Sequence, residues 1–109
     1  MRIDVRQEGG AVVLAVSGRM DATTVDGFEA ACRDRIAPEN PRIVVDFAKL
    51  EYVSSAGLRG ILTMEKESRA AGSRIVFCGM QDMVADMFDL SGFNSILQVC
   101  PTLEQALAG

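Results

Sequence analysis

Apolar residues recur along this chain with two spacings, and each spacing indicates one type of secondary structure. Short runs in which apolar residues alternate or are contiguous indicate β-strands. Apolar residues three or four positions apart indicate amphipathic helices. Runs of the first kind predict strands over residues 2–6, 11–16, 42–47, 74–78 and 96–100. Spacing of the second kind predicts helices over residues 25–36, 55–71, 81–90 and 103–107.

The first two predicted strands form a hairpin, and the later elements alternate. Ile3 and Val5 share one face of a half-exposed edge strand, and Gly9-Gly10 supplies a turn. The run Ala11–Val16 is apolar on both faces, which is typical of a central strand. Strands that alternate with helices form parallel sheets with right-handed crossovers. The pattern therefore predicts an α/β fold: a mixed, mostly parallel sheet of four to five strands with about four helices, opened by a β-hairpin.

Helix start signals precede the first and the last predicted helix. Thr23 with Asp26 three residues later fits a capping box, and Asp21 is a competing cap. Thr102 with Gln105 fits a second capping box. We therefore expect Thr23 or Asp21 to cap the first helix and Thr102 to cap the last.

The two middle helices differ in where their polar residues lie. In the helix over residues 55–71, the apolar side chains of the first turns should face the sheet. Its later turns are polar and should be solvated; they carry Glu65, Lys66, Glu67 and Arg69. The helix over residues 81–90 carries Met83, Val84, Met87 and Phe88 on one face. The methionines and Phe88 could form a pliable docking face, but their helical spacing favours burial in the core.

Length and charge limit the number of domains and the kinds of partner that this chain can have. At 109 residues the chain can bury a core, and we expect one domain over residues 1–109. A net charge of −4 argues against binding to nucleic acid or to an anionic membrane surface. The first ten residues hold no apolar core of signal-peptide length, and the longest clean apolar run is too short to span a bilayer. We therefore expect a cytoplasmic protein without membrane insertion.

Cysteine and histidine usage excludes several kinds of site. Cys32, Cys78 and Cys100 form no C-x-x-C pair, so we interpret each as a small buried apolar residue. The chain has no histidine, which excludes hydrolases that use a Ser-His or Cys-His pair. It also lacks clustered acids, a Walker glycine loop and a G-x-G-x-x-G motif. We expect no metal, no cofactor and no enzymatic activity. A small-molecule binder or an enzyme is one alternative hypothesis for this chain.

The segment from Val44 to Leu62 carries the most distinctive chemistry. An apolar strand ends at Asp46, and the chain then turns at Ser54-Ser55-Ala56-Gly57 into a helix. Backbone N–H groups point outward at a helix start, and the helix dipole favours a negative group there. A phosphate could therefore sit on such a serine without unfolding the protein. The simpler interpretation is that Ser55 only caps the helix.

The motif V-D-F-x-x-L-x-Y-V-S-S-A-G-L-R resembles the phosphorylation-site segment of the STAS family, the anti-sigma factor antagonists. In that family a kinase modifies the serine two residues before the glycine, which is Ser55 here. Ser54, where many members have Asp, is the second candidate. The segment G-R-M-D places Asp21 where the family has an acidic residue near the modified serine, and the resemblance continues to the C-terminus. It implies a STAS fold and a site formed by Asp21, Ser54, Ser55, Ala56, Gly57 and Leu58.

The resemblance also implies a mechanism of partner switching. The unphosphorylated protein would bind an anti-sigma factor that is a Ser/Thr kinase with a histidine-kinase-like ATPase fold. This binding would release the sigma factor. Phosphorylation of Ser55 would dissociate the complex, and a metal-dependent Ser/Thr phosphatase would reset it. The phosphate adds about −1.5 to −2 charges at pH 7, and we expect Asp21 and Asp46 near the site to add repulsion. The alternative is a STAS subunit of a lipid- or anion-transport complex that is never phosphorylated.

Overall fold

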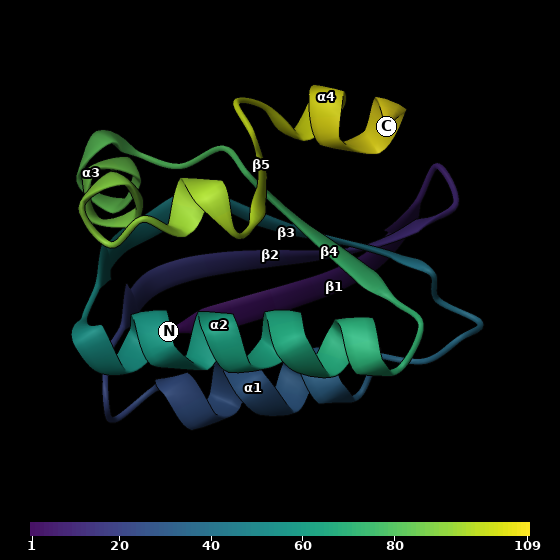
Figure 1. The fold of residues 1–109 in the computed structure, drawn as a ribbon, viewed down its shortest axis with the longest axis horizontal. Helices are drawn as coiled ribbons and strands as arrows, with labels where there is room; N and C mark the ends of the chain where they lie inside the picture. The colour runs from purple at the N-terminus through teal and green to yellow at the C-terminus, as the bar shows by residue number, and fades with distance from the viewer.

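A computed structural model describes all residues from 1 to 109 as a five-stranded sheet with helices on both of its faces (Figure 1). The elements in chain order are β1 (Arg2–Glu8), β2 (Ala11–Met20), α1 (Val25–Arg33), β3 (Arg42–Val53), α2 (Ser55–Ala70), β4 (Arg74–Cys78), α3 (Asp82–Leu90), the 3-10 helix η1 (Phe93–Ser95), β5 (Gln98–Cys100) and α4 (Leu103–Ala108). The predicted mixed α/β fold with an opening hairpin is confirmed.

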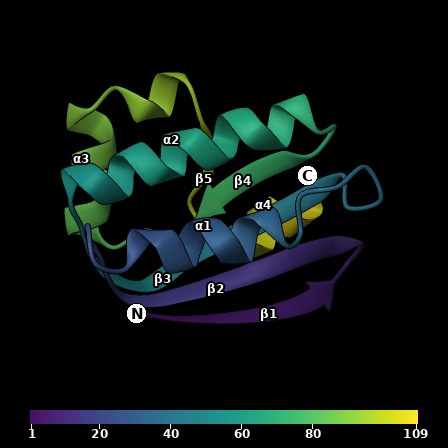
Figure 2. The ribbon, with the colours of Figure 1, turned by 90° about the horizontal axis from the view of Figure 1, so that it is seen from below.

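The strands follow one another across the sheet in the order β1-β2-β3-β4-β5. β1 and β2 pair antiparallel, and the other three pairings are parallel. Gly9 and Gly10 have φ values of 57° and 80°, the left-handed conformations that a tight hairpin turn needs. Helices α1 and α2 lie side by side on one face, α4 covers the other, and α3 stands at the end of the sheet where α2 begins (Figures 1 and 2).

The two central strands are longer than their apolar runs predict. β2 continues to Met20 and β3 to Val53, and these two residues are paired. The pairing shifts register between Ala15 and Ser17 and again between Gly18 and Arg19. Such irregularities break the alternation that identifies a strand in sequence. Because β3 extends to Val53, it runs without a loop into the start of α2.

The core has two parts of unequal size. The larger is a cluster of 21 buried residues between the sheet and the helices α1, α2 and α3. Its centre is Phe47, whose ring centroid lies 5.7 Å from that of Phe77 and 6.4 Å from those of Phe28 and Phe88. The smaller cluster has five buried residues on the α4 face: Ala11, Val13, Val44, Cys78 and Ala106. Most of the hydrophobic stabilisation therefore lies on the face that α1 and α2 cover.

Several side chains differ from their predicted environments. Met83 is 55% exposed, whereas Val84 and Phe88 are buried and Met87 packs partly against the core. The nine-residue α3 rests on the end of the sheet and buries a narrower stripe than its apolar face suggests.

Glu65, predicted to be solvated, is only 6% exposed; its Oε1 pairs with Arg69, and its Oε2 has no hydrogen-bond partner. Its burial follows from contacts with the rest of the fold, which helical spacing alone does not reveal.

The ends of the elements and the burial of the cysteines agree only in part with the sequence predictions. The N-cap of α1 is Thr24, so the predicted capping box at Thr23 is wrong, whereas Thr102 caps α4 through the N–H of Gln105 as predicted. The last strand is shorter than predicted, because Ile96 lies outside it and is 51% exposed. Cys32 and Cys78 are buried as predicted, and Cys100 is only partly buried.

Candidate functional site

Ser54 forms the junction between β3 and α2. It is the N-cap of α2 in an extended conformation, and its Oγ accepts the N–H of Gly57 at 3.2 Å. Its backbone N–H donates to the carbonyl of Met20 at 2.9 Å, which ties the helix start to the end of β2. The capping role that the sequence left open for Ser55 therefore belongs to Ser54.

Ser55 is the first residue of α2 and is exposed. Its hydroxyl makes no hydrogen bond within the protein, so it is free to react or to contact another molecule. The first turn of α2 contains no acidic residue. Unpaired N–H groups and the helix dipole stabilise an anion at such a position. Chemically, this site can carry a phosphoryl group on an exposed hydroxyl without the loss of the helix cap.

The three residues after Ser55 form the base of the site rather than its surface. Ala56 is half-buried, and Gly57 and Leu58 are buried. A Cβ atom on Gly57 would lie 2.8 Å from Cγ2 of Val53 and 2.9 Å from the carbonyl oxygen of Met20, closer than real contacts allow. Gly57 is therefore required for α2 to pack on the strand ends.

Asp21 lies in the turn between β2 and α1, next to the Met20 carbonyl that receives Ser54. Its Oδ1 accepts the hydroxyl of Thr23 at 2.6 Å and the N–H of Thr23 at 2.9 Å. These two hydrogen bonds, with a smaller effect from the charge of Arg19, hold the pKa of Asp21 below its ordinary value. The structure thus places an ionised carboxylate in a fixed turn that adjoins the serine junction.

Asp46, the other acidic residue expected near the serine, is not brought to it. Asp46 pairs with Ala15 and Cys78 in the neighbouring strands, and its Oδ1 accepts the N–H of Ala48 at 2.9 Å. Because successive side chains of a strand point to opposite faces, Asp46 lies on the α4 side, whereas Val45 joins the core under α1 and α2. Repulsion of a phosphate on Ser55 by Asp46 is therefore not supported.

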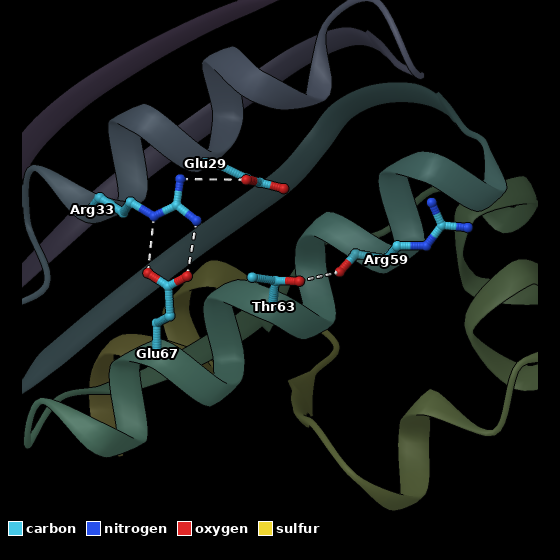
Figure 3. A network of polar contacts seen from close by, with 5 residues as sticks. All are labelled: Glu29, Arg33, Arg59, Thr63 and Glu67. Carbon is cyan, nitrogen blue, oxygen red and sulfur yellow. Dashed lines mark hydrogen bonds and ion pairs between the residues drawn. The ribbon is translucent and has the colours of Figure 1, made fainter.

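Two arginines near the junction are not among the site residues that the sequence predicts. Arg59 follows Ser55 by four residues on α2, a spacing that places both on one helix face. It is exposed and makes no ion pair, and it points away from the network in which Arg33 joins Glu29 and Glu67 (Figure 3). Arg19 lies over the ring of Tyr52, 4.2 Å from the centroid. The four-residue spacing was the one sequence signal that could have identified Arg59.

The described side chains contain no group of three or more His, Cys, Asp or Glu residues placed to hold a metal ion. None of the helices combines the length and the apolar composition that a membrane crossing requires.

Comparisons with known proteins identify the family to which this architecture belongs. A sequence model of the STAS domain matches residues 2–106. The chain belongs to the STAS domain family. BtrV of Bordetella bronchiseptica, whose name assigns it provisionally to the anti-sigma factor antagonists, is 30% identical over 108 residues, covering 99% of this chain and 93% of BtrV.

Solved STAS structures share the fold. An anti-sigma factor antagonist from Mycobacterium paratuberculosis has a TM-score of 0.88 at 23% identity and covers 98% of this chain and 91% of its own. SpoIIAA is known unphosphorylated, with a TM-score of 0.78, 21% identity, and coverage of 97% of this chain and 93% of its own. The phosphorylated form, from Bacillus, has a TM-score of 0.72, 20% identity, and coverage of 98% and 97%. The likeness confirms the predicted STAS fold.

Proposed function

We propose that this STAS chain is an anti-sigma factor antagonist that binds its partner through the start of α2 and is switched off by phosphorylation of Ser55. The chain acts as ligand and as kinase substrate, not as catalyst. Its partner is an anti-sigma factor that is also a Ser/Thr kinase with a histidine-kinase-like ATPase fold, and binding releases the sigma factor. A metal-dependent Ser/Thr phosphatase restores the active form.

The observation that carries this proposal is that the two adjacent serines have different structural roles. Ser54 caps α2, and the adjacent Ser55 is exposed with an unused hydroxyl. Modification of Ser55 therefore removes no hydrogen bond from the fold. The names of relatives such as BtrV support the regulatory class, and SpoIIAA has been described both with and without phosphate.

Because the fold tolerates the phosphate, its effect must fall on the partner. A surface that rests on the unmodified hydroxyl would have to accommodate a bulky dianion, at the cost of desolvation and like-charge repulsion. Asp21 already contributes one negative charge beside the junction. A loss of about 2.7 kcal/mol weakens binding about a hundredfold, which is enough to release a partner.

Arg59 gives the switch a second component. In the unmodified protein its guanidinium has no ion-pair partner and is available to an acidic group of the docked protein. A phosphate on Ser55, four residues earlier on the same helix face, would compete for this cation. Phosphorylation would then both add negative charge and neutralise the positive charge that favours docking.

The test uses the anti-sigma factor kinases of the source organism that have a histidine-kinase-like ATPase fold. Each is incubated with this chain and ATP, the modified residue is mapped by mass spectrometry, and affinities are measured by calorimetry. We expect phosphate on Ser55, tight binding by Ser55→Ala, and a loss of about a hundredfold for Ser55→Asp. Thr102→Asp is the matched control, because it adds a carboxylate at the N-terminus of α4 on the other face, and it should bind like the wild type.

Three outcomes would contradict parts of the proposal. Equal affinity of the phosphorylated and unmodified chains would overturn the switch. Phosphate on Ser54 with an untouched Ser55 would show that the residue assignment is wrong. A chain that no such kinase binds or modifies would favour the alternative, a STAS subunit of a transport complex.

A further inference from the structure

Two of the three cysteines are neighbours in the sheet although 22 positions separate them in the sequence. Cys78 ends β4, Cys100 ends β5, and the two residues are paired in the parallel ladder. Paired residues of adjacent strands point to the same face. Accordingly, Cys78 belongs to the small cluster under α4, and Cys100 packs against that cluster.

This arrangement satisfies the main geometric requirement for a disulfide. Neighbouring strands lie about 4.8 Å apart, which falls within the Cα separation of about 4.4–6.8 Å that disulfides span. Both residues are the last of their strands, and Gly79 and Pro101 follow them outside the ladder, so small adjustments that bring the Cβ atoms together disturb little pairing. We propose that Cys78 and Cys100 form a reversible, redox-sensitive disulfide that links β5 to β4.

The two thiols have different roles in the reaction. Cys78 is fully buried, and burial, with smaller effects from the charges of Asp46 and Cys100, raises its pKa to about 12. Cys100 is only partly buried and borders two depressions of the surface, one beside α3 and η1 and one beside α4. An oxidant therefore reaches Cys100 first, and Cys78 is the resolving thiol.

The oxidant is a peroxide such as hydrogen peroxide. The Cys100 thiolate attacks one oxygen, the O–O bond breaks, and the leaving hydroxide takes up a proton to become water, which leaves a sulfenic acid on Cys100. The Cys78 sulfur then attacks the Cys100 sulfur, the S–O bond breaks, and the hydroxyl leaves as a second water with the Cys78 proton. Two thiols and one peroxide give one disulfide and two waters, and two electrons pass from sulfur to oxygen.

The bond would constrain one particular part of the fold. It closes the segment from Cys78 to Cys100, which contains α3, η1 and the three-residue edge strand β5. This segment stands at the end of the sheet where α2 begins (Figures 1 and 2). A cross-link over a loop of this length stabilises a small domain, and the reduced form is restored by thiol–disulfide exchange.

The test treats the reduced full chain with hydrogen peroxide and follows it by intact mass and by peptide mapping without reductant. We expect a loss of about 2 Da, a linked pair of peptides that contain Cys78 and Cys100, and reversal by dithiothreitol. The oxidised chain should unfold at a temperature several degrees higher. Cys100→Ser, at the partly buried position, should abolish the mass loss, the linked peptides and the rise in unfolding temperature. Cys32→Ala, in the core of the opposite face, should retain them.

Cys78→Ala provides a second test, and alanine adds no hydroxyl at this buried position. With Cys78 absent, the Cys100 sulfenic acid should persist and be trapped by dimedone. The proposal is overturned if peroxide converts Cys100 to a sulfinic or sulfonic acid while Cys78 stays reduced. It is equally overturned if the only disulfide is intermolecular, or if the linkage includes Cys32.

Discussion

The face of the sheet under α1 and α2 differs from the face under α4 in the number and size of the residues that it buries. The first belongs to a cluster of 21 buried residues in which ring contacts connect five phenylalanines, and the second to a cluster of five small or medium-sized residues. α4 has only six residues, and Arg42 ties it to β3 through the carbonyls of Ala106 and Leu107. The α1/α2 face therefore provides a large packed base below the serine junction, whereas only the short α4 covers the face that holds the cysteine pair.

On the α1/α2 face, an ion pair also joins the two helices on their outer side. Arg33 of α1 donates two hydrogen bonds to the carboxylate of Glu67 in α2, at 2.8 and 2.9 Å, and also contacts Glu29 (Figure 3). Gly60 allows the two helices to approach, because a Cβ there would overlap Cγ2 of Val25. Helix α2 is therefore held by α1 as well as by the sheet.

The largest expected difference between the faces comes from two adjacent valines of β3. Val45 is 0% exposed in the large cluster, and Val44 is 1% exposed in the small one. We expect Val45→Ala to lower the free energy of unfolding by about 2–3 kcal/mol and Val44→Ala by about 1 kcal/mol, because a short helix can settle over a cavity more easily than a packed core can. Urea denaturation measures both. Equal losses, or a greater loss for Val44, would contradict the comparison.

A smaller effect is expected at the serine junction. Ser54→Ala removes the acceptor for the N–H of Gly57 and should cost about 1 kcal/mol of unfolding free energy. Ser55→Ala removes no hydrogen bond and should lie within about 0.5 kcal/mol of the wild type. The two variants are each other's control in thermal and urea unfolding. If Ser55→Ala were the more damaging, the hydroxyl of Ser55 would not be free, and the structural basis of the proposed switch would fail.

The smallest expected effect is the contribution of the ion pair between α1 and α2 to stability, which depends on pH. The hydrogen bonds from Arg33 hold the pKa of Glu67 below its ordinary value. A carboxylate whose pKa is lower in the folded state stabilises the fold above the unfolded pKa, and this contribution is lost as the pH falls through the folded value.

Glu67→Gln should therefore lose some stability at neutral pH and show a weaker fall of stability with acid below about pH 4.5. The measurement is the urea midpoint at a series of pH values. Glu104→Gln is the control, because Glu104 is exposed and makes no ion pair, and it should follow the wild type. An unchanged acid dependence in Glu67→Gln would show that the pair contributes nothing to holding α1 against α2.

By itself, the sequence determined the order of the elements and the place of the serine turn. Both follow from local signals: apolar spacing reports the period of a helix or a strand, and glycine pairs mark a hairpin. The motif around Ser54 and Ser55 identified the junction before any coordinates, and the family it indicated is confirmed. The role of Ser55 as the phosphorylated residue stays a prediction.

Only the tertiary structure decided what covers each residue and what lies beside it. Helical spacing placed Met83 and Phe88 on one face, but α3 buries Phe88 and leaves Met83 exposed. β2 and β3 continue past their register shifts to the pair of Met20 and Val53, and Ser54 instead of Ser55 meets the end of β2 and caps α2. Burial and strand register depend on contacts between segments far apart in the chain, which local periodicity does not encode. For the same reason the sequence alone gave no sign that Cys78 and Cys100 stand side by side.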